Sequence, residues 1–182
     1  MAGALPLLPA SRADLFAYLT AVGIKTTTVE HPAVFTVAES EKLERDVPGA
    51  HTKNLFLKDA KGRLFLVIAQ SYTPVDLKQL HKKLGCARLS FGSAPLLLES
   101  LGVTPGSVTA FAMINDQSAR VSLVFDAALM SFDVINCHPL INTATTSITR
   151  ADLMAFFRAT GTNRRSSRCP KCDDENCAEN YG

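Results

Sequence analysis

Apolar residues recur at helical spacing in several stretches of the chain, each bounded by capping or helix-ending residues. The clearest stretch begins at Ser11, where Ser11 and Asp14 have the spacing of a capping box and Gly23 follows the last apolar position. Thr149 and Asp152 repeat the capping pattern ahead of another amphipathic stretch. The pattern predicts helices over residues 11–22, 37–47, 74–84 and 93–101, and a last helix that opens at 149–152.

Runs of β-branched and aromatic residues lie between these helices and predict strands. Residues 54–58 and 64–69 flank a short turn that contains Gly62, which is typical of a β-hairpin. Several strands meet through short turns, so the expected fold class is α/β (α+β), with helices packed around a mixed sheet. The pattern predicts a second hairpin from 108–115 and 120–125, and further strands over 26–30, 132–137 and 143–148.

Composition divides the chain into one folded domain and two ends. Hydrophobic residues make up 47% and charged residues 20% of the 182 residues, as in folded soluble proteins. Residues 1–10 are apolar without a basic segment and are expected to form a loose leader, not a signal peptide. Residues 162–182 contain almost nothing apolar and are expected to form a disordered tail. The predicted domain therefore covers residues 11–161.

Cysteine usage bears on the cellular compartment and on metal binding. The five cysteines, an odd number, include Cys86 and Cys137 in separate segments that are predicted to fold. This pattern suits a reducing compartment, and no apolar run is long enough to span a bilayer, so we expect a cytoplasmic protein. Cys169 and Cys172 in the tail have the spacing of a zinc pair, but with Cys177 they supply only three of four ligands. A redox-sensitive tail without metal is the simpler interpretation.

Three polar positions are candidates for chemistry. Lys53 lies where a loop enters an apolar strand, and an ammonium there can hold a phosphate or a developing negative charge. Gly106 lies in a loop ahead of a predicted strand, where a ligand can approach bare backbone amides. His138 precedes Pro139 at a strand end, close to an amide and several hydroxyls. The ordinary alternatives are a solvated lysine, a plain turn and a threonine-rich strand capped by a histidine.

Motifs of several enzyme classes are absent from the sequence. It contains no nucleophile elbow, phosphate-binding P-loop, dinucleotide-binding glycine pattern or zinc-protease helix motif. Cys137 and His138 do not form a nucleophile pair, because adjacent strand residues point to opposite faces. We therefore expect neither a cofactor nor a catalytic metal.

A net charge of +2 is too small to indicate a nucleic-acid partner, so such a contact would need a local basic patch. Lys78, Lys82 and Lys83 lie on a predicted helix, and Arg88 follows it. These residues indicate either a contact with a tRNA acceptor stem or a solvated helix face.

The order and spacing of the polar segments are more specific than any one of them. Together they resemble the YbaK/prolyl-tRNA-synthetase-associated editing family, and within it the free-standing ProX (ProXp-ala, PrdX) branch. The resemblance covers residues 11–160. Its segments are 49–59 with Lys53 and Asn54, 89–93, 101–109 with Gly106 and Ser107, and 138–146 with His138, Asn142 and Thr143.

The resemblance implies a curved mixed sheet and a trans-editing hydrolase that cleaves the ester of a mischarged tRNA. The ProX branch implies alanine on proline tRNA as the substrate. Lys53 matches an essential lysine that would orient the terminal adenosine, and the amide of Gly106 would face the substrate carbonyl. His138 would form one wall of the pocket that holds the amino-acid side chain. The further residues implied to line the substrate pocket are Asn54, Ser107, Asn142 and Thr143.

One departure from the family pattern leaves the substrate open. The G-x-x-x-P loop motif begins at Gly106 but ends in Ala110, and alanine leaves the loop freer than proline would. A sister specificity for Cys, Ser or Thr on tRNA is therefore a second hypothesis. A third is a non-catalytic module that binds tRNA or associates with prolyl-tRNA synthetase. The sequence does not indicate an oligomeric state.

Overall fold

The computed structural model describes residues 9–33 and 46–162. The helix predicted over 37–47 lies almost wholly outside the described residues, as do most of the leader and the tail cysteines Cys169, Cys172 and Cys177. Within the described ranges, no helix is long and apolar enough to cross a membrane.

Both ends of the domain extend beyond the predicted boundaries. Ala10, assigned to the leader, is buried, and its backbone N–H donates to Oδ1 of Asn115 at 2.8 Å. Thr162, assigned to the tail, is also buried, and its hydroxyl lies 2.9 Å from that of Thr160. Ala10 and Thr162 thus pack with the described part of the chain, one residue outside each predicted boundary.

The helices and strands follow local signals in the sequence. At the first helix the Ser11 hydroxyl accepts from the Asp14 N–H, and the Asp14 carboxylate accepts from the Ser11 N–H, so the capping box is confirmed. In chain order the elements are α1 (Arg12–Ala21), β1 (Thr26–Glu30), β2 (Ala50–Asp59), β3 (Leu64–Gln70), α3 (Leu77–Lys83), β4 (Leu89–Phe91), α4 (Ala94–Leu101), the 3-10 helix η1 (Ala110–Asn115), β5 (Val121–Phe125), the 3-10 helix η2 (Leu129–Ser131), β6 (Val134–Cys137), β7 (Ala144–Thr149) and α5 (Arg150–Ala159).

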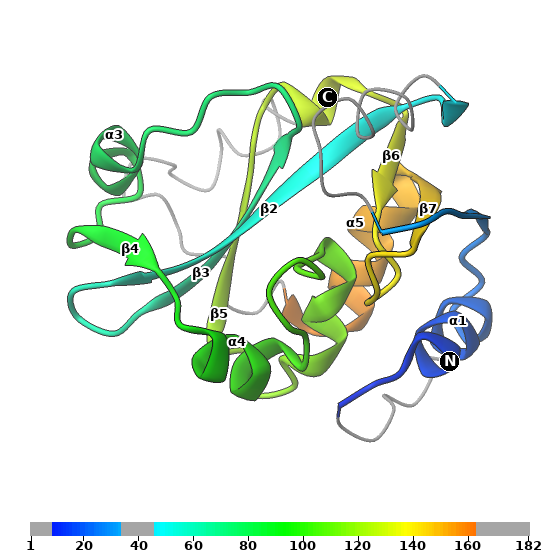
Figure 1. The fold of residues 1–182 in the computed structure, drawn as a ribbon, viewed down its shortest axis with the longest axis horizontal. Coiled ribbons are helices and arrows are strands. Elements are labelled where there is room, and N and C mark those ends of the chain that lie inside the picture. Colours follow the sequence, from blue (N-terminus) through cyan, green and yellow to red (C-terminus); the bar gives the residue numbers. More distant parts are fainter. Residues whose placement is uncertain (1–8, 34–45, 163–182) are drawn as a thin grey trace.

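The strands of the described residues form one seven-stranded sheet, and the prediction of a mixed sheet is confirmed (Figure 1). Their order is β1-β7-β6-β2-β3-β5, and β4 pairs with β2 away from this path. The pairs β2–β6 and β3–β5 are parallel, and the other pairs are antiparallel. The long strand β2 links both halves of the sheet, because it pairs with β6 at its start and with β3 and β4 further on.

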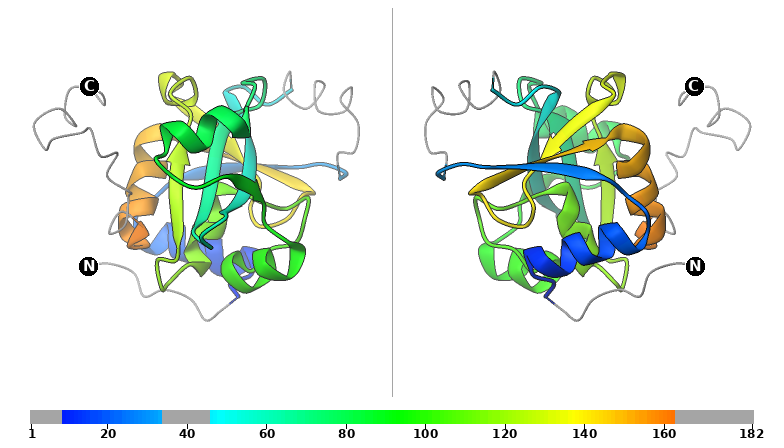
Figure 2. Two further views of the ribbon diagram at one scale, coloured as in Figure 1. Left: turned by 90° about the vertical axis from the view of Figure 1, so that its left-hand side faces the viewer. Right: turned by 90° about the vertical axis from the view of Figure 1, so that its right-hand side faces the viewer.

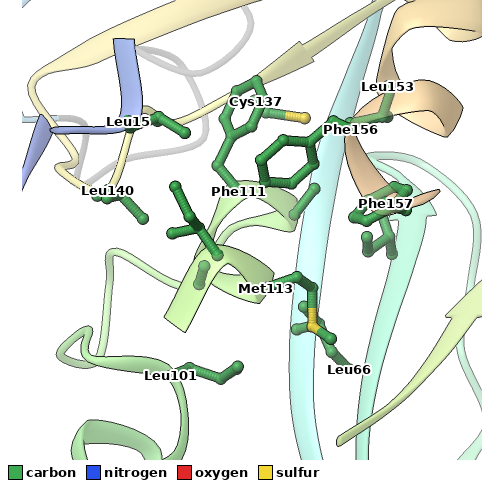
Figure 3. Packing of buried hydrophobic residues seen from close by; sticks show 14 of the residues in the cluster. Leu15, Leu66, Leu101, Phe111, Met113, Cys137, Leu140, Leu153, Phe156 and Phe157 are labelled. Atoms are coloured by element: carbon green, nitrogen blue, oxygen red, sulfur yellow. The ribbon is translucent and has the colours of Figure 1, made fainter. Parts of the chain in front are cut away.

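Two apolar clusters lie on opposite faces of β2 and β3, because alternate strand residues point to opposite sides. Phe56 belongs to the larger cluster, which α1, α4, η1 and α5 complete, whereas Leu57 belongs to the smaller cluster beside α3. Figure 3 shows the larger cluster, where the rings of Phe111 and Phe156 meet edge to face with centroids 5.4 Å apart. Figure 2 shows α3 separated from α1 and α5 by the sheet.

The second predicted hairpin is wrong. Residues 110–115 form the buried helix η1 instead of a strand, and Thr109 caps it by accepting from the Phe111 N–H. The following strand, β5, pairs in parallel with β3. The short strand β4 was not predicted, and α3 is shorter than the predicted helix because its N-cap is Asp76.

Candidate active site

Lys53 lies in the middle of β2 and is held by a backbone carbonyl. Its side chain is half-buried, and Nζ donates to the carbonyl oxygen of Thr73 in the turn after β3. It pairs with Ala69 and shares a strand face with Leu55 and Leu57, which pack on the side of α3. Lys53 is therefore a fixed side chain, unlike the solvated lysine that was the ordinary alternative.

Asn54 points to the opposite side of β2, the side that Phe56 occupies. Its Nδ2 lies 3.4 Å from the hydroxyl of Thr52, and its Oδ1 is buried without a hydrogen-bond partner among the described residues. A buried acceptor without a donor is unfavourable, so this oxygen could accept from a ligand. The side chains of the adjacent residues Lys53 and Asn54 thus point to opposite sides of β2.

Gly106 lies between α4 and η1, so the prediction that it precedes a strand is wrong. A turn closed by the Ser107 N–H and the Thr104 carbonyl at 3.0 Å surrounds it, and its φ is +89°. A Cβ added at Gly106 would have only Asn142 Nδ2 near it, at 3.8 Å. The fold thus brings two predicted site residues together, with half-buried Ser107 next in the chain.

The loop from β6 to β7 contains three predicted site residues: His138, Asn142 and Thr143. It turns tightly, because the N–H of Leu140, at φ +66°, donates to the His138 carbonyl at 3.0 Å. The Thr143 side chain is exposed, whereas its backbone carbonyl accepts from the His31 N–H at 3.0 Å. Thr143 therefore hydrogen-bonds through its backbone carbonyl to the segment that follows β1.

His138 offers a neutral imidazole with a defined tautomer. Its Nδ1 lies 3.0 Å from the Ala144 carbonyl, and because a carbonyl only accepts, Nδ1 carries the proton. Burial lowers the pKa of His138, the hydrogen bond to the Ala144 carbonyl partly opposes this, and electrostatic interactions with the His31 and His51 rings lower it further. A neutral ring protonated on Nδ1 has Nε2 available as an acceptor.

His31 was missed in the sequence, although it lies beside His138. The two ring centroids are 6.2 Å apart. His31 Nδ1 lies 2.8 Å from the Pro32 carbonyl and Nε2 lies 2.9 Å from the Thr145 hydroxyl, so both nitrogens have partners. The signal was present as a His-Pro pair that mirrors His138 and Pro139, but the pairing of β1 with β7 is needed to bring them together.

Ala110 occupies the position where the family loop motif has proline, and it is completely buried at the start of η1. Its backbone is fixed by the helical turn that Thr109 caps. Packing in the core therefore restrains Ala110, and its effect on substrate specificity stays a prediction.

The predicted basic patch is exposed and lies at one end of the sheet. Lys82 and Lys83 end α3, and Arg88 precedes β4, with its carbonyl accepting from the Ala60 N–H at 3.0 Å. None of the three cations is paired with a carboxylate of residues 9–33 or 46–162. Their charges are therefore available to a partner.

The buried cysteine of β6 is poorly suited to nucleophilic chemistry. Cys137 is buried, and desolvation raises the pKa of its thiol to about 12 although the Thr52 hydroxyl lies 3.8 Å from Sγ. A thiol with so high a pKa is not a nucleophile at neutral pH. No cluster of three or more His, Cys, Asp or Glu side chains suited to a metal occurs in residues 9–33 and 46–162.

Several known proteins are similar to this chain over most of its length. A prolyl-tRNA synthetase associated domain-containing protein 1 from Danio rerio is 42% identical over 151 residues, which cover 82% of this chain and 82% of that protein. The prolyl-tRNA editing protein ProX of Acetoanaerobium sticklandii is 38% identical over 148 residues, covering 81% of this chain and 90% of ProX.

A solved structure described as a proposed trans-editing enzyme for prolyl tRNA synthetase has the same fold. It superposes with a TM-score of 0.64 at 19% identity and covers 81% of this chain and 92% of its own. The sequence profile of the aminoacyl-tRNA editing domain matches residues 31–156, a range that includes Lys53, Gly106 and His138. The chain belongs to the aminoacyl-tRNA editing domain family.

Proposed function

We propose that this protein is a trans-editing aminoacyl-tRNA deacylase that prefers alanine on proline tRNA. Family membership supports an editing function, and a relative named as a prolyl-tRNA editing protein supports proline tRNA. The observation that best supports a hydrolytic site is the open backbone of Gly106 beside Asn142. A backbone N–H in such a loop is suited to a carbonyl oxygen that becomes negative during ester hydrolysis.

The proposed reaction adds water to the ester carbonyl of the aminoacyl-tRNA. The water oxygen bonds to the carbonyl carbon, the carbonyl oxygen becomes an oxyanion, and the bond to the ribose oxygen then breaks. The amino acid leaves as a carboxylic acid, and the ribose oxygen takes a proton to become a hydroxyl. An aminoacyl ester is already activated, so positioning of water and stabilisation of the oxyanion suffice without a covalent nucleophile.

Five of the predicted site residues have a defined task in this proposal. The Gly106 amide donates to the oxyanion, and the ammonium of Lys53 orients the terminal adenosine through its phosphate or ribose. Neutral His138 bounds the amino-acid pocket, and its Nε2 can accept from a donor on the substrate. The Asn54 amide, on the side of β2 opposite Lys53, and the Asn142 amide beside Gly106 line the amino-acid pocket. A pocket of alanine size rejects proline mainly by exclusion, because apolar contacts alone separate close analogues by only about 1–3 kcal/mol.

We propose the basic patch of Lys82, Lys83 and Arg88 as a contact for tRNA phosphates. Exposed cations without paired carboxylates support this assignment, since phosphate binding needs local positive charge that is not already neutralised. Neutralising all three should weaken tRNA binding and flatten its salt dependence by about three charges, whereas an unchanged salt slope would reject the assignment.

Prolyl-tRNA synthetase is the proposed protein partner. Relatives named as prolyl-tRNA synthetase associated domain proteins support it. Co-sedimentation of the two purified proteins with and without tRNA would test the association.

A deacylation panel tests the function directly. Wild-type protein is given proline tRNA charged with Ala, Pro, Cys, Ser or Thr, and the loss of each ester is followed over time. We expect Ala to be removed fastest and Lys53→Ala to be nearly inactive. Lys58→Ala, an exposed lysine on the same strand, is the matched control and should keep full activity.

The panel separates the competing hypotheses. Faster removal of Cys, Ser or Thr than of Ala would replace the alanine specificity with a sister specificity. Binding of tRNA without release of any amino acid would reject an enzyme in favour of a binding module. Full activity of Lys53→Ala would reject the proposed role of this lysine.

A further inference from the structure

The Lys53 ammonium is held by a turn, and the turn is itself held from a third strand. Nζ of Lys53 donates to the carbonyl oxygen of Thr73, in the segment between β3 and α3. The Thr73 hydroxyl donates to Oδ2 of Asp126 at 2.6 Å, and Asp126 directly follows β5. Two successive hydrogen bonds therefore link Lys53 on β2 to Thr73 in the turn after β3, and Thr73 to Asp126 after β5.

Asp126 is well fixed and uses both carboxylate oxygens. Oδ2 also accepts from the Gln70 N–H at 3.3 Å, and Oδ1 accepts from the Ala128 N–H at 3.1 Å. Its backbone N–H donates to the Ile68 carbonyl at 2.9 Å, which continues the parallel pairing of β3 and β5. The carboxylate is therefore an anchor on the sheet and not a loose surface charge.

The turn is also fixed from the side of β2. The N–H of Ser71 donates to the His51 carbonyl at 2.9 Å, and the N–H of Thr73 donates to the Gln70 carbonyl at 3.0 Å. Hydrogen bonds therefore hold the turn from β2, from β3 and, through the Thr73 hydroxyl, from Asp126.

Thr73, whose carbonyl oxygen accepts from the Lys53 ammonium, lines a groove of about 400 Å³. Ala69, directly across from Lys53 on β3, lines this groove together with Thr73 and Asp126. Water in the groove can compete for the Thr73 carbonyl and for the Asp126 carboxylate. A lysine side chain with four flexible bonds needs such a fixed acceptor to keep one position there.

We propose that Thr73 and Asp126 are positioning residues that set the place of the Lys53 ammonium. The inference rests on the proposed function, in which Lys53 orients the substrate. Asp126 holds the Thr73 hydroxyl, the hydroxyl fixes the direction of the Thr73 carbonyl, and the carbonyl holds the ammonium. Preorganisation of this kind matters because a displacement of about 1 Å in a positioning group can cost about 100-fold in rate.

Single substitutions test each link. Thr73→Val removes the hydroxyl and keeps the carbonyl and the side-chain shape, while Thr73→Ser keeps the hydroxyl. We expect Thr73→Val and Asp126→Ala to lower kcat by about 10- to 100-fold with KM changed less than about twofold. Thr73→Ser should stay near wild type. Thr27→Val on the exposed face of β1 is the control, and should leave kcat unchanged.

A double-mutant cycle distinguishes positioning from general damage. If Thr73 acts through Lys53, Lys53→Ala combined with Thr73→Val should be no slower than Lys53→Ala alone. Multiplied losses in the double variant, or a Thr73→Val variant with wild-type kcat, would overturn the proposal. Thermal unfolding of each variant is measured alongside, and the cycle is repeated with Asp126→Asn if Thr73→Val does not fold.

A measurement without substrate separates this inference from the proposed function. Nitrogen-15 NMR of the lysine ammonium groups, assigned with Lys53→Ala, reports the Lys53 environment in the free protein. The Lys53 signal should shift and exchange faster with water in Thr73→Val and in Asp126→Ala, but not in Thr27→Val. An unmoved signal overturns the positioning role. A moved signal in a protein that deacylates no tRNA supports the contact and rejects only the enzymatic function.

Discussion

Substitution of Gly106 by alanine separates the backbone conformation of this residue from its role in the site. At φ +89° an alanine is strained, and the left-handed region costs an L-residue about 1–2 kcal/mol. No collision adds to this, because the new Cβ would lie 3.8 Å from Asn142 Nδ2, an ordinary contact distance. For a chain of this size each kcal/mol lowers Tm by about 2–4 °C, so we expect a drop of about 2–8 °C.

The expected loss of activity is larger than this loss of stability. Gly106→Ala either rotates the amide to relieve the strain or holds a methyl group where the substrate approaches, and loss of one oxyanion donor costs about 100- to 1,000-fold in kcat. Gly23→Ala is the matched control, because Gly23 has φ +77° with nothing near the added Cβ. It should lose similar stability in differential scanning calorimetry and keep full deacylation activity.

Two results would refute this reasoning. Gly106→Ala that deacylates at the wild-type rate, with the same fall in Tm as Gly23→Ala, would show that the Gly106 amide does not face the substrate. A fall in Tm far beyond that of Gly23→Ala would show that the surroundings of Gly106 are tighter than the 3.8 Å separation indicates.

Three further predictions concern pH, a buried carboxylate and thiol reactivity. The pKa of His138 in the folded protein lies below its ordinary value, so the unfolded chain binds a proton first as the pH falls through about 6.5. The free energy of unfolding therefore decreases below that pH. In urea titrations, its decrease between pH 7 and pH 5 should be smaller for His138→Gln than for the wild-type protein. Burial alone would raise the pKa of Asp59, but hydrogen bonds from Arg63, Lys61 and Ala87 outweigh burial and lower it. Asp59→Ala should therefore lower the free energy of unfolding in urea by about 2–3 kcal/mol. A decrease of less than about 0.5 kcal/mol would contradict this structural role. Cys137 should resist iodoacetamide in the native protein and react only after unfolding, as peptide mass mapping can follow, whereas rapid native labelling would contradict its burial.

Local signals in the sequence were sufficient for much of the fold. The capping box at Ser11 and the β-branched run of β1 were predicted within a residue of their bounds. The hairpin of β2 and β3 was also predicted, with Gly62 at φ +85° in its turn, but β2 starts earlier because polar His51 and Thr52 continue the strand. These features depend on residues close together in the chain.

The failures arise where distant parts of the fold decide the local structure. An apolar run such as 108–115 fits a strand or a buried helical turn equally well, and packing against Phe156 selects the helix. The three-residue strand β4 is too short for periodicity to detect. The parallel pairing of β3 with β5 joins segments that no turn motif connects, so no local pattern predicts it.

The same limit applies to the site. The resemblance identified Gly106 and Asn142, and the fold brings them together. It did not identify His31, which reaches His138 through the pairing of Glu30 with Ala144. Registers between strands distant in the chain decide such contacts, and one sequence does not reveal them.

The pairing of β1 with β7 also affects how the chain can fold during synthesis. β1 ends at Glu30, whereas its described pairing partner β7 begins only at Ala144 and immediately precedes α5, so β1 is synthesised long before β7. At about 5–20 residues per second, a nascent β1 waits several seconds on the ribosome with an unpaired strand edge. Val29 is exposed even after folding, whereas Thr27 and Glu30 keep that edge polar. A polar first strand thus limits aggregation of the nascent chain until the last strand arrives.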